Sequence, residues 1–342
     1  MASGKLLRQL ISAGAEGDAQ AFRAASEKVI EEERQKKHHL LANDLERLLY
    51  GSQSSTANFS RPLSALLPVA KDNDLPLLES RPVVRDETDI VLSDDSRSAL
   101  NEILLEHNRA DVLRSHGLQP AQKLLFCGPP GCGKTLAAEV IASSLSLPLV
   151  LVRLDSVISS FLGETASNLR QVFDFVAQNP VVALFDEFDA LTKDRGDAAD
   201  HGELKRSVNA VLQMLDGYRG ESILIATTNY ESLLDRAVWR RFDEVVHFDM
   251  PNLEQIKQLL EQKLAGVRRN FNIEDRKVHG LFKGLSHAEI ERVLRRAVKE
   301  MVLSNREFLE VVHLKDALAR EYRSKEVSLQ ARWILETAPQ SA

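Results

Sequence analysis

The stretch Gly128-Pro-Pro-Gly-Cys-Gly-Lys-Thr135 decides the fold class, because it fits the pattern G-x-x-x-x-G-K-[ST]. It follows an apolar run at residues 123–126 and precedes a helical pattern at residues 135–144. In this context the glycines let backbone N–H groups turn inward around phosphate oxygens, and the helix N-terminus adds its positive end. The stretch therefore predicts a phosphate-binding loop between a strand and a helix.

The loop and the first helical turn supply most of the predicted ligand contacts. Lys134 is expected to reach the β- and γ-phosphates of a nucleotide, and Thr135 to hold a magnesium ion. The Cys132 thiol lies at a helix N-terminus, which can make a thiol acidic and reactive, but we favour a small residue tolerated at a variable loop position. The predicted phosphate-binding set is Gly128, Pro129, Pro130, Gly131, Cys132, Gly133, Lys134, Thr135 and Leu136.

Two acids end a second apolar run, VVALFDE at residues 181–187. A buried strand of this kind delivers its last side chains to the carboxyl edge of a parallel sheet, where ligands collect. Downstream of a phosphate-binding loop, Asp186 is predicted to bind the magnesium shell and Glu187 to orient and polarise the attacking water. The alternative is a solvated strand end without chemistry.

Short apolar runs alternate with helical patterns across the middle of the chain. This alternation predicts an α/β fold in three layers around a mostly parallel sheet. The predicted strands lie at residues 123–126, 149–152, 181–185, 222–226 and 245–248.

Both ends of the chain are predicted to be helical. Apolar residues recur at helical spacing between residues 6 and 50, and no strand pattern follows Pro251. Capping boxes at Asn252/Gln255 and Ser286/Glu289 predict helices over residues 253–264 and 287–303. A last amphipathic helix is expected from residue 312 to residue 321, with an extension toward residue 334. The predicted domains are an N-terminal helical module (1–50), a linker (51–85), an α/β core (86–250) and a C-terminal helical lid (251–342).

Composition excludes several classes of protein. With 44% hydrophobic and 27% charged residues and no apolar run near 18 residues, the chain resembles globular proteins without a membrane span. The first residues lack a signal-peptide pattern, and the two cysteines, Cys127 and Cys132, do not form a disulfide framework. We therefore expect a cytoplasmic protein. A net charge of −6 disfavours nucleic acid as the main partner.

Four motifs in order, GPPGCGKT, VVALFDEFDAL, IATTNY and LLDRAVWRRFDEVVHF, resemble the AAA+ ATPases, and within them the AAA clade that remodels proteins. The resemblance covers about residues 89–303. It implies a P-loop NTPase core with ATP and Mg²⁺ as cofactors, ATP hydrolysis, and a homo-hexameric ring. By the same resemblance, Asn229 is the sensor-1 residue that helps to fix the water, with a simple turn asparagine as the alternative.

Arg240 and Arg241 resemble the segment that supplies an arginine finger to the ATP site of a neighbouring subunit. Which of the two is the finger stays open, and surface ion pairs are the alternative. Residues 286–289 resemble the element at the start of a lid helix, which implies that Ala288 packs near adenine. His287 replaces the usual glycine, so its contact is open, and a capping-turn histidine is an equal alternative.

Residues 159–165, SSFLGET, resemble the pore loop of AAA proteins that thread polypeptides. Phe161, Leu162 and Gly163 would form an aromatic and hydrophobic grip on a glycine hinge. The alternative is that Phe161 and Leu162 are core residues at the start of a helix.

These features favour a ring-shaped ATPase that unfolds, disassembles or remodels proteins, with residues 1–50 recruiting a substrate or adaptor. The sequence contains neither H-E-x-x-H nor G-x-S-x-G, so any proteolysis would belong to a separate partner protease. A second hypothesis is an ATP-gated switch that licenses an effector protein without threading. A DNA-acting motor is weaker, because the 161–164 segment has no basic residue.

Overall fold

The computed structural model describes residues 22, 25–29, 67–70, 75–83, 85–157, 164–191, 210–231 and 236–337. The chain divides into two compact units, Met1–Leu66 and Leu67–Ala342. In the first unit, residue 22 and residues 25–29 are helical, with Ala25 and Val29 buried. The rest of the predicted N-terminal module lies outside the described residues.

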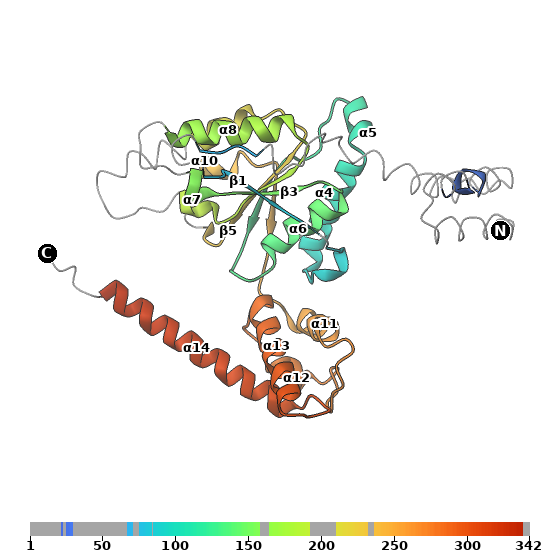
Figure 1. Cartoon of the computed structure of the whole chain (residues 1–342), viewed down its shortest axis with the longest axis vertical. Coiled ribbons are helices and arrows are strands. Elements are labelled where there is room, and N and C mark those ends of the chain that lie inside the picture. The colour runs from blue at the N-terminus through green and yellow to red at the C-terminus, as the bar shows by residue number, and fades with distance from the viewer. Residues whose placement is uncertain are drawn as a thin grey trace. The chain divides into compact units, whose positions relative to one another are not determined.

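The second unit is built on a β-sheet with helices packed around it (Figure 1). The sheet has six strands in the order β1-β3-β4-β5-β2-β6. All neighbouring strands pair in parallel except β1 and β3, which are antiparallel. The predicted mostly parallel α/β sheet is therefore confirmed. The strands are β1 (Leu78–Arg81), β2 (Lys123–Cys127), β3 (Leu149–Val152), β4 (Val182–Phe185), β5 (Ile223–Thr228) and β6 (Glu244–His247).

The edge strand β1 is absent from the sequence-based prediction and lies within the stretch assigned to the linker. Its residues Leu78–Arg81 pair with β3 from Leu149 to Val152. Only Leu78 is buried in this four-residue strand, so no alternating apolar pattern marks it. The strand forms because a neighbouring strand offers it backbone partners, which a local pattern does not show.

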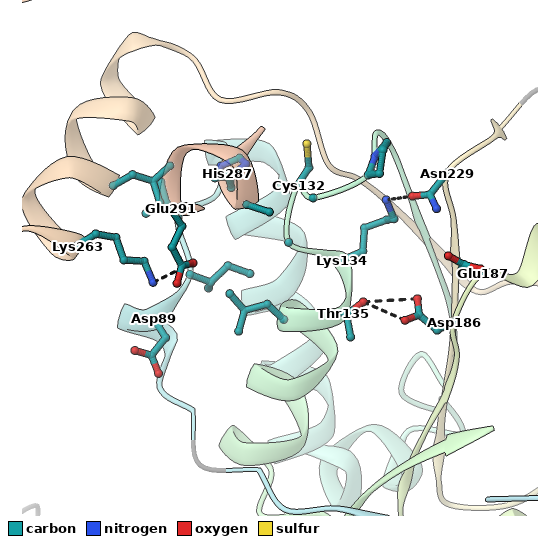
Figure 2. A pocket seen from close by; sticks show the side chains of 18 residues that line it. Asp89, Cys132, Lys134, Thr135, Asp186, Glu187, Asn229, Lys263, His287 and Glu291 are labelled. Carbon is teal, nitrogen blue, oxygen red and sulfur yellow. Dashed lines mark hydrogen bonds and ion pairs between the residues drawn. The ribbon is translucent and has the colours of Figure 1, made fainter. Parts of the chain in front are cut away.

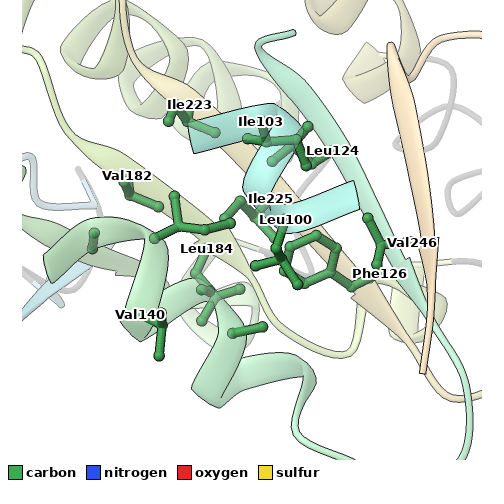
Figure 3. Close-up of a cluster of buried hydrophobic side chains, with 14 of the residues drawn as sticks. Leu100, Ile103, Leu124, Phe126, Val140, Val182, Leu184, Ile223, Ile225 and Val246 are labelled. Atoms are coloured by element: carbon green, nitrogen blue, oxygen red, sulfur yellow. The ribbon is translucent and has the colours of Figure 1, made fainter. Parts of the chain in front are cut away.

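Helices cover both faces of the sheet. The helices α4 (Asp94–Asn108) and α6 (Lys134–Ser144) pack on one face, where Leu100 and Ile103 meet Phe126 and Ile225 (Figure 3). The helix α8 (Glu164–Gln178) packs on the opposite face, with Phe173 against Phe185 at a ring-centroid distance of 5.8 Å. The shorter elements are η2 (Glu87–Asp89), α5 (Ala110–Ser115), α7 (Leu154–Val157), η3 (Phe188–Leu191) and α10 (Arg236–Trp239).

The C-terminal helices form a core of their own. They are α11 (Leu253–Lys263), α12 (Arg276–Gly280), α13 (His287–Leu303) and α14 (Val311–Thr337). Both predicted capping boxes are confirmed at Asn252/Gln255 and Ser286/Glu289, and such caps stabilise a helix by about 1 kcal/mol each. Within the described part of the chain, no helix is both long enough and apolar enough to cross a membrane.

Candidate functional site

The predicted phosphate-binding loop joins β2 to α6 with backbone angles that only glycine adopts easily. Gly128 has a φ of 138° and Gly131 a φ of 74°. A Cβ atom on Gly128 would lie 2.0 Å from the carbonyl oxygen of Phe248, so the close approach of these two backbone segments also requires glycine. The loop therefore holds a fixed path that turns into the N-terminus of α6, where unpaired N–H groups favour an anion.

The side chain of Lys134 is buried under this loop. Its ammonium group donates to the carbonyl oxygens of Gly128 (2.7 Å) and Pro129 (2.9 Å) and to Oδ1 of Asn229 (2.8 Å; Figure 2). Burial lowers the pKa of Lys134, and the nearby acidic groups, Asp186 among them, oppose this shift. The structure thus places two predicted site residues, Lys134 and Asn229, in direct contact.

The predicted acid pair lies at the end of β4, beside the first turn of α6. The hydroxyl of Thr135 lies 3.3 Å from Oδ2 and 3.5 Å from Oδ1 of Asp186. Glu187 is exposed and has a left-handed backbone, with a φ of 53°. The end of β4 therefore presents one half-buried and one exposed carboxylate to the phosphate-binding loop.

A hydroxyl and a carboxylate facing each other are oxygen donors of the kind that Mg²⁺ prefers. Thr135 and Asp186 therefore fit a magnesium ion that takes its remaining oxygens from phosphate and water. Within the described ranges no cluster of three or more His, Cys, Asp or Glu side chains could hold a metal by itself. Mg²⁺ usually keeps several waters and is held by one or two protein oxygens together with phosphate oxygens.

The start of the lid helix α13 closes one wall of a cavity of about 370 Å³. The Ala288 N–H donates to the carbonyl oxygen of Gly131 at 3.0 Å, so lid and loop touch directly. Lys263 and Glu291 form an ion pair of 3.5 Å on the same wall (Figure 2). A volume of this size suits a small-molecule ligand.

His287 lines this cavity beside Ala288. Both of its ring nitrogens are buried without a hydrogen-bond partner in the described part of the chain. Burial lowers the pKa of His287 to about 4, so the imidazole is neutral near pH 7. The lid therefore places an uncharged ring at a position where the family resemblance implies glycine.

The two cysteines near the loop are free and buried. Burial raises the pKa of Cys127 to about 12 and also raises the pKa of Cys132. The Cys132 thiol lies 3.6 Å from the sulfur of Met250. These surroundings agree with the favoured interpretation of Cys132 as a packed small residue, because a reactive thiol needs a lowered pKa and exposure.

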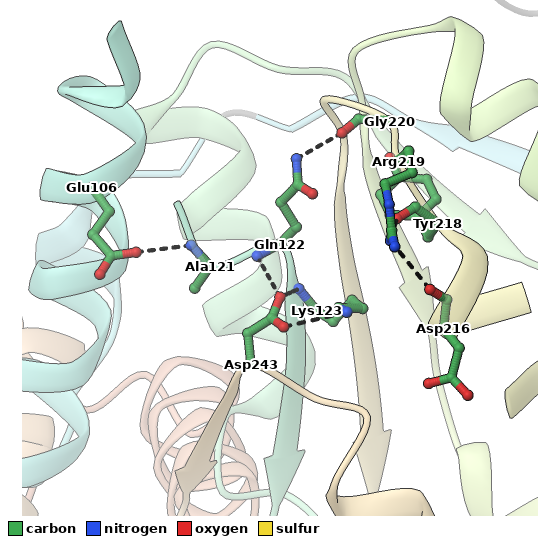
Figure 4. Close-up of polar contacts among 9 residues, drawn as sticks. All are labelled: Glu106, Ala121, Gln122, Lys123, Asp216, Tyr218, Arg219, Gly220 and Asp243. Carbon is green, nitrogen blue, oxygen red and sulfur yellow. Dashed lines mark hydrogen bonds and ion pairs between the residues drawn. The ribbon is translucent and has the colours of Figure 1, made fainter. Parts of the chain in front are cut away.

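The adjacent arginines lie on the surface and are not among the described residues that line the cavity. Arg240 is exposed, whereas the Arg241 guanidinium is half-buried and pairs with Asp216 at 3.0 Å. The neighbouring Asp243 accepts the N–H groups of Gln122 (3.0 Å) and Lys123 (2.9 Å; Figure 4). Asp243 thus ties the segment that carries both arginines to the start of β2.

The predicted pore-loop residues Phe161, Leu162 and Gly163 lie outside the described residues. Conversely, the site contains groups that sequence reasoning missed, among them Thr227 at the end of β5 and the Lys263–Glu291 pair. The position of Thr227 near the end of an apolar strand is a signal that the sequence contains, since polar residues at such ends gather at the sheet edge. No local sequence pattern indicates the Lys263–Glu291 ion pair, because its two residues belong to different helices.

Comparison with known proteins adds to this geometry. Residues 124–250 match the "ATPase family associated with various cellular activities (AAA)". An uncharacterized AAA family ATPase of Sinorhizobium fredii, y4kL, is 40% identical over 325 residues, which are 95% of this chain and 97% of that protein. The chain belongs to the AAA ATPase family. This AAA ATPase therefore binds nucleotide and hydrolyses ATP, as the four sequence motifs predict.

Two further relatives of this AAA ATPase are larger proteins. The ATP-dependent zinc metalloprotease FtsH of Mycoplasmopsis synoviae is 30% identical over 234 residues, 66% of this chain and 35% of that protein. The proteasome-activating nucleotidase of Methanococcus maripaludis is 28% identical over 257 residues, 73% of this chain and 63% of that protein. The chain thus spans less than two thirds of each of these two relatives.

Proposed function

We propose that this AAA ATPase is a ring-shaped motor that couples ATP hydrolysis to the unfolding, disassembly or remodelling of proteins. The observation that carries the proposal is that Asp186 and Asn229, at the ends of β4 and β5, contact Thr135 and Lys134 beside the phosphate-binding loop. The chain is also related to FtsH and to a proteasome-activating nucleotidase. Both of these relatives are named for work on protein degradation. We propose the shared step, ATP-driven handling of a polypeptide, for this chain.

In the proposed site, the loop N–H groups and Lys134 bind the phosphates of ATP, and Ala288 packs near the base. Thr135 and Asp186 hold Mg²⁺, which neutralises charge on the β- and γ-phosphates. Glu187 orients the attacking water, and Asn229 helps to fix it. The contact of Asn229 with Lys134 at 2.8 Å supports this arrangement, because it keeps the asparagine beside the γ-phosphate position.

The proposed assembly is a homo-hexamer in which Arg240 or Arg241 completes the ATP site of the neighbouring subunit. An arginine supplied in trans stabilises the charge of the transition state. The exposed position of Arg240 supports it as the finger, whereas Arg241 already pairs with Asp216 in its own subunit. We further propose that residues 1–50 recruit a protein substrate or adaptor and that any protease is a separate partner.

Threading is tested at Phe161. We expect Phe161→Ala to keep ATP turnover within about threefold of wild type but to abolish ATP-dependent unfolding of a substrate, because alanine offers little apolar area to a passing chain. Substrates are first captured with a Glu187→Gln variant held in ATP and identified by mass spectrometry. Phe161→Tyr is the matched control and should retain most of the unfolding activity.

Two results would contradict the threading proposal. If Phe161→Ala leaves remodelling intact, the ATPase acts instead as a nucleotide-gated switch that licenses a bound effector protein. If Phe161→Ala lowers the melting temperature by several degrees, Phe161 is a core residue rather than a grip on substrate. Stimulation of turnover by DNA in a salt-sensitive way would favour the nucleic-acid motor.

A further inference from the structure

The hydroxyl of Thr227 connects both acids at the end of β4. It donates to Oδ1 of Asp186 at 2.5 Å and accepts the backbone N–H of Glu187 at 3.1 Å. The residue is 1% exposed, so water does not compete for either bond. One buried oxygen atom therefore contacts the side chain of the first acid and the backbone of the second.

These two bonds restrain the rotation of the Asp186 carboxylate and the backbone conformation of Glu187. With Oδ1 held by Thr227, the Asp186 carboxylate cannot rotate freely, and its Oδ2 is turned to within 3.3 Å of the Thr135 hydroxyl. The Glu187 backbone has a φ of 53°, a left-handed conformation that is strained for a non-glycine residue. The bond from the Glu187 N–H to Thr227 helps to hold this backbone in place.

Consecutive side chains at the end of β5 contact different residues. Thr227 and Asn229 are two residues apart and reach Asp186 and Lys134, respectively. Thr228 between them is 0% exposed and donates instead to Asp189 at 3.3 Å. Among these three residues, Thr227 is therefore the one that contacts the acid pair Asp186 and Glu187.

We infer that Thr227 is a positioning residue for ATP hydrolysis, which acts through Asp186 and Glu187 without touching the nucleotide. The inference rests on the roles proposed above for these two acids. Its hydroxyl is the functional group, because the β-branched carbon skeleton could be supplied by valine, which packs in a strand equally well. Loss of the hydroxyl frees the carboxylate and leaves the Glu187 N–H without a partner.

The test compares Thr227→Val with Thr227→Ser. We expect valine to lower kcat by about 10- to 100-fold, the effect of one hydrogen bond to a charged group. The Kd for a fluorescent ATP analogue should stay within about threefold, because Lys134 and the loop are untouched. Serine keeps the hydroxyl and should retain kcat within about threefold. A role in packing alone would not produce this split between kcat and Kd together with rescue by serine.

Ser222→Ala is the matched control, since it removes a fully buried hydroxyl that contacts the backbone of Val176, Asn179 and Val181 directly before β5, away from the two acids. It should lower kcat by less than about threefold while its melting temperature falls as much as that of Thr227→Val. Equal losses of kcat at both positions would overturn the inference, as would a Thr227→Val variant with kcat near wild type. If Thr227→Val does not fold, Thr227→Ala and Thr227→Ser decide in the same way.

Failure of this inference is distinguishable from failure of the proposed site roles. A Glu187→Gln variant with near-normal turnover would refute the role of Glu187 itself. Lost turnover in Glu187→Gln combined with normal turnover in Thr227→Val would leave that role intact and overturn only the positioning by Thr227.

Discussion

At the scale of single residues, the ammonium group of Lys134 is held by three oxygen acceptors at the centre of the site. Two of them are carbonyl oxygens of the loop and the third belongs to Asn229. Glu187, in contrast, is exposed at the rim of the same site. This difference in burial supports the different tasks proposed for the two residues, phosphate binding for the lysine and orientation of water for the carboxylate.

Lys134→Ala should abolish ATP binding, whereas Glu187→Gln should retain binding and lose hydrolysis. The first change removes a charge contact to the phosphates, and the second removes only the carboxylate that orients water. Equilibrium binding of labelled ATP, measured beside phosphate release, separates the two defects. A Glu187→Gln protein with near-normal turnover would show that this carboxylate is not catalytic.

At the scale of elements, the phosphate-binding loop and the lid helix α13 meet at Gly131. A Cβ atom on Gly131 would lie 2.8 Å from the Ser286 hydroxyl and 3.0 Å from the Cβ of Ala288. The direct bond from the Ala288 N–H to Gly131 depends on this closeness. The phosphate-binding loop and the lid helix are therefore in direct contact at this one glycine.

Gly131→Ala should weaken ATP binding by about tenfold or more, because the added methyl group pushes α13 away at a cost of about 1–3 kcal/mol. Gly117→Ala is the matched control: its φ of 75° equals that of Gly131 to within a degree, but nothing lies within 4 Å of its Cβ. Both variants should lose about 1–2 kcal/mol of folding stability from backbone strain. Titration with labelled ATP gives the difference, and equal affinity losses in the two variants would rule out the steric contact as the cause.

At the scale of the whole molecule, the adjacent arginines Arg240 and Arg241 are separate from the described lining of the phosphate-binding cavity. The described lining of the cavity contains neither arginine, and Arg240 is exposed. A surface arginine that does not line the site of its own chain fits the proposed finger for a neighbouring subunit. The trans arrangement predicts that turnover depends on assembly of the subunits.

Arg240→Ala should lower turnover by at least about tenfold while leaving ATP binding intact, because the finger acts across a subunit interface. Mixing this variant with inactive Lys134→Ala subunits should restore part of the turnover, since each partner supplies what the other lacks. Arg241→Ala is measured in parallel, because it also breaks the pair with Asp216. Turnover per subunit that does not change with protein concentration, together with no gain on mixing, would exclude a finger in trans.

Much of this molecule was predictable because its signals are local. The phosphate-binding loop, five strands and both capping boxes depend on residues within a few positions of one another, and turn chemistry and periodicity act at that range. The same patterns missed β1, whose four residues become a strand only through backbone pairing with β3. The roles of the predicted site residues remain predictions.

The contacts that assemble the site were decided by tertiary structure alone. Lys134 and Asn229 are 95 positions apart in the sequence. The parallel pairing of β2 with β5 brings the ends of these strands together, so that Nζ of Lys134 lies 2.8 Å from Oδ1 of Asn229. The junction of Gly131 with Ala288 and the bridge from Thr227 to both acids arise in the same way. The sequence determined which chemical groups the protein carries, whereas strand order and lid packing decided which of them touch, because those contacts join segments that no local pattern relates.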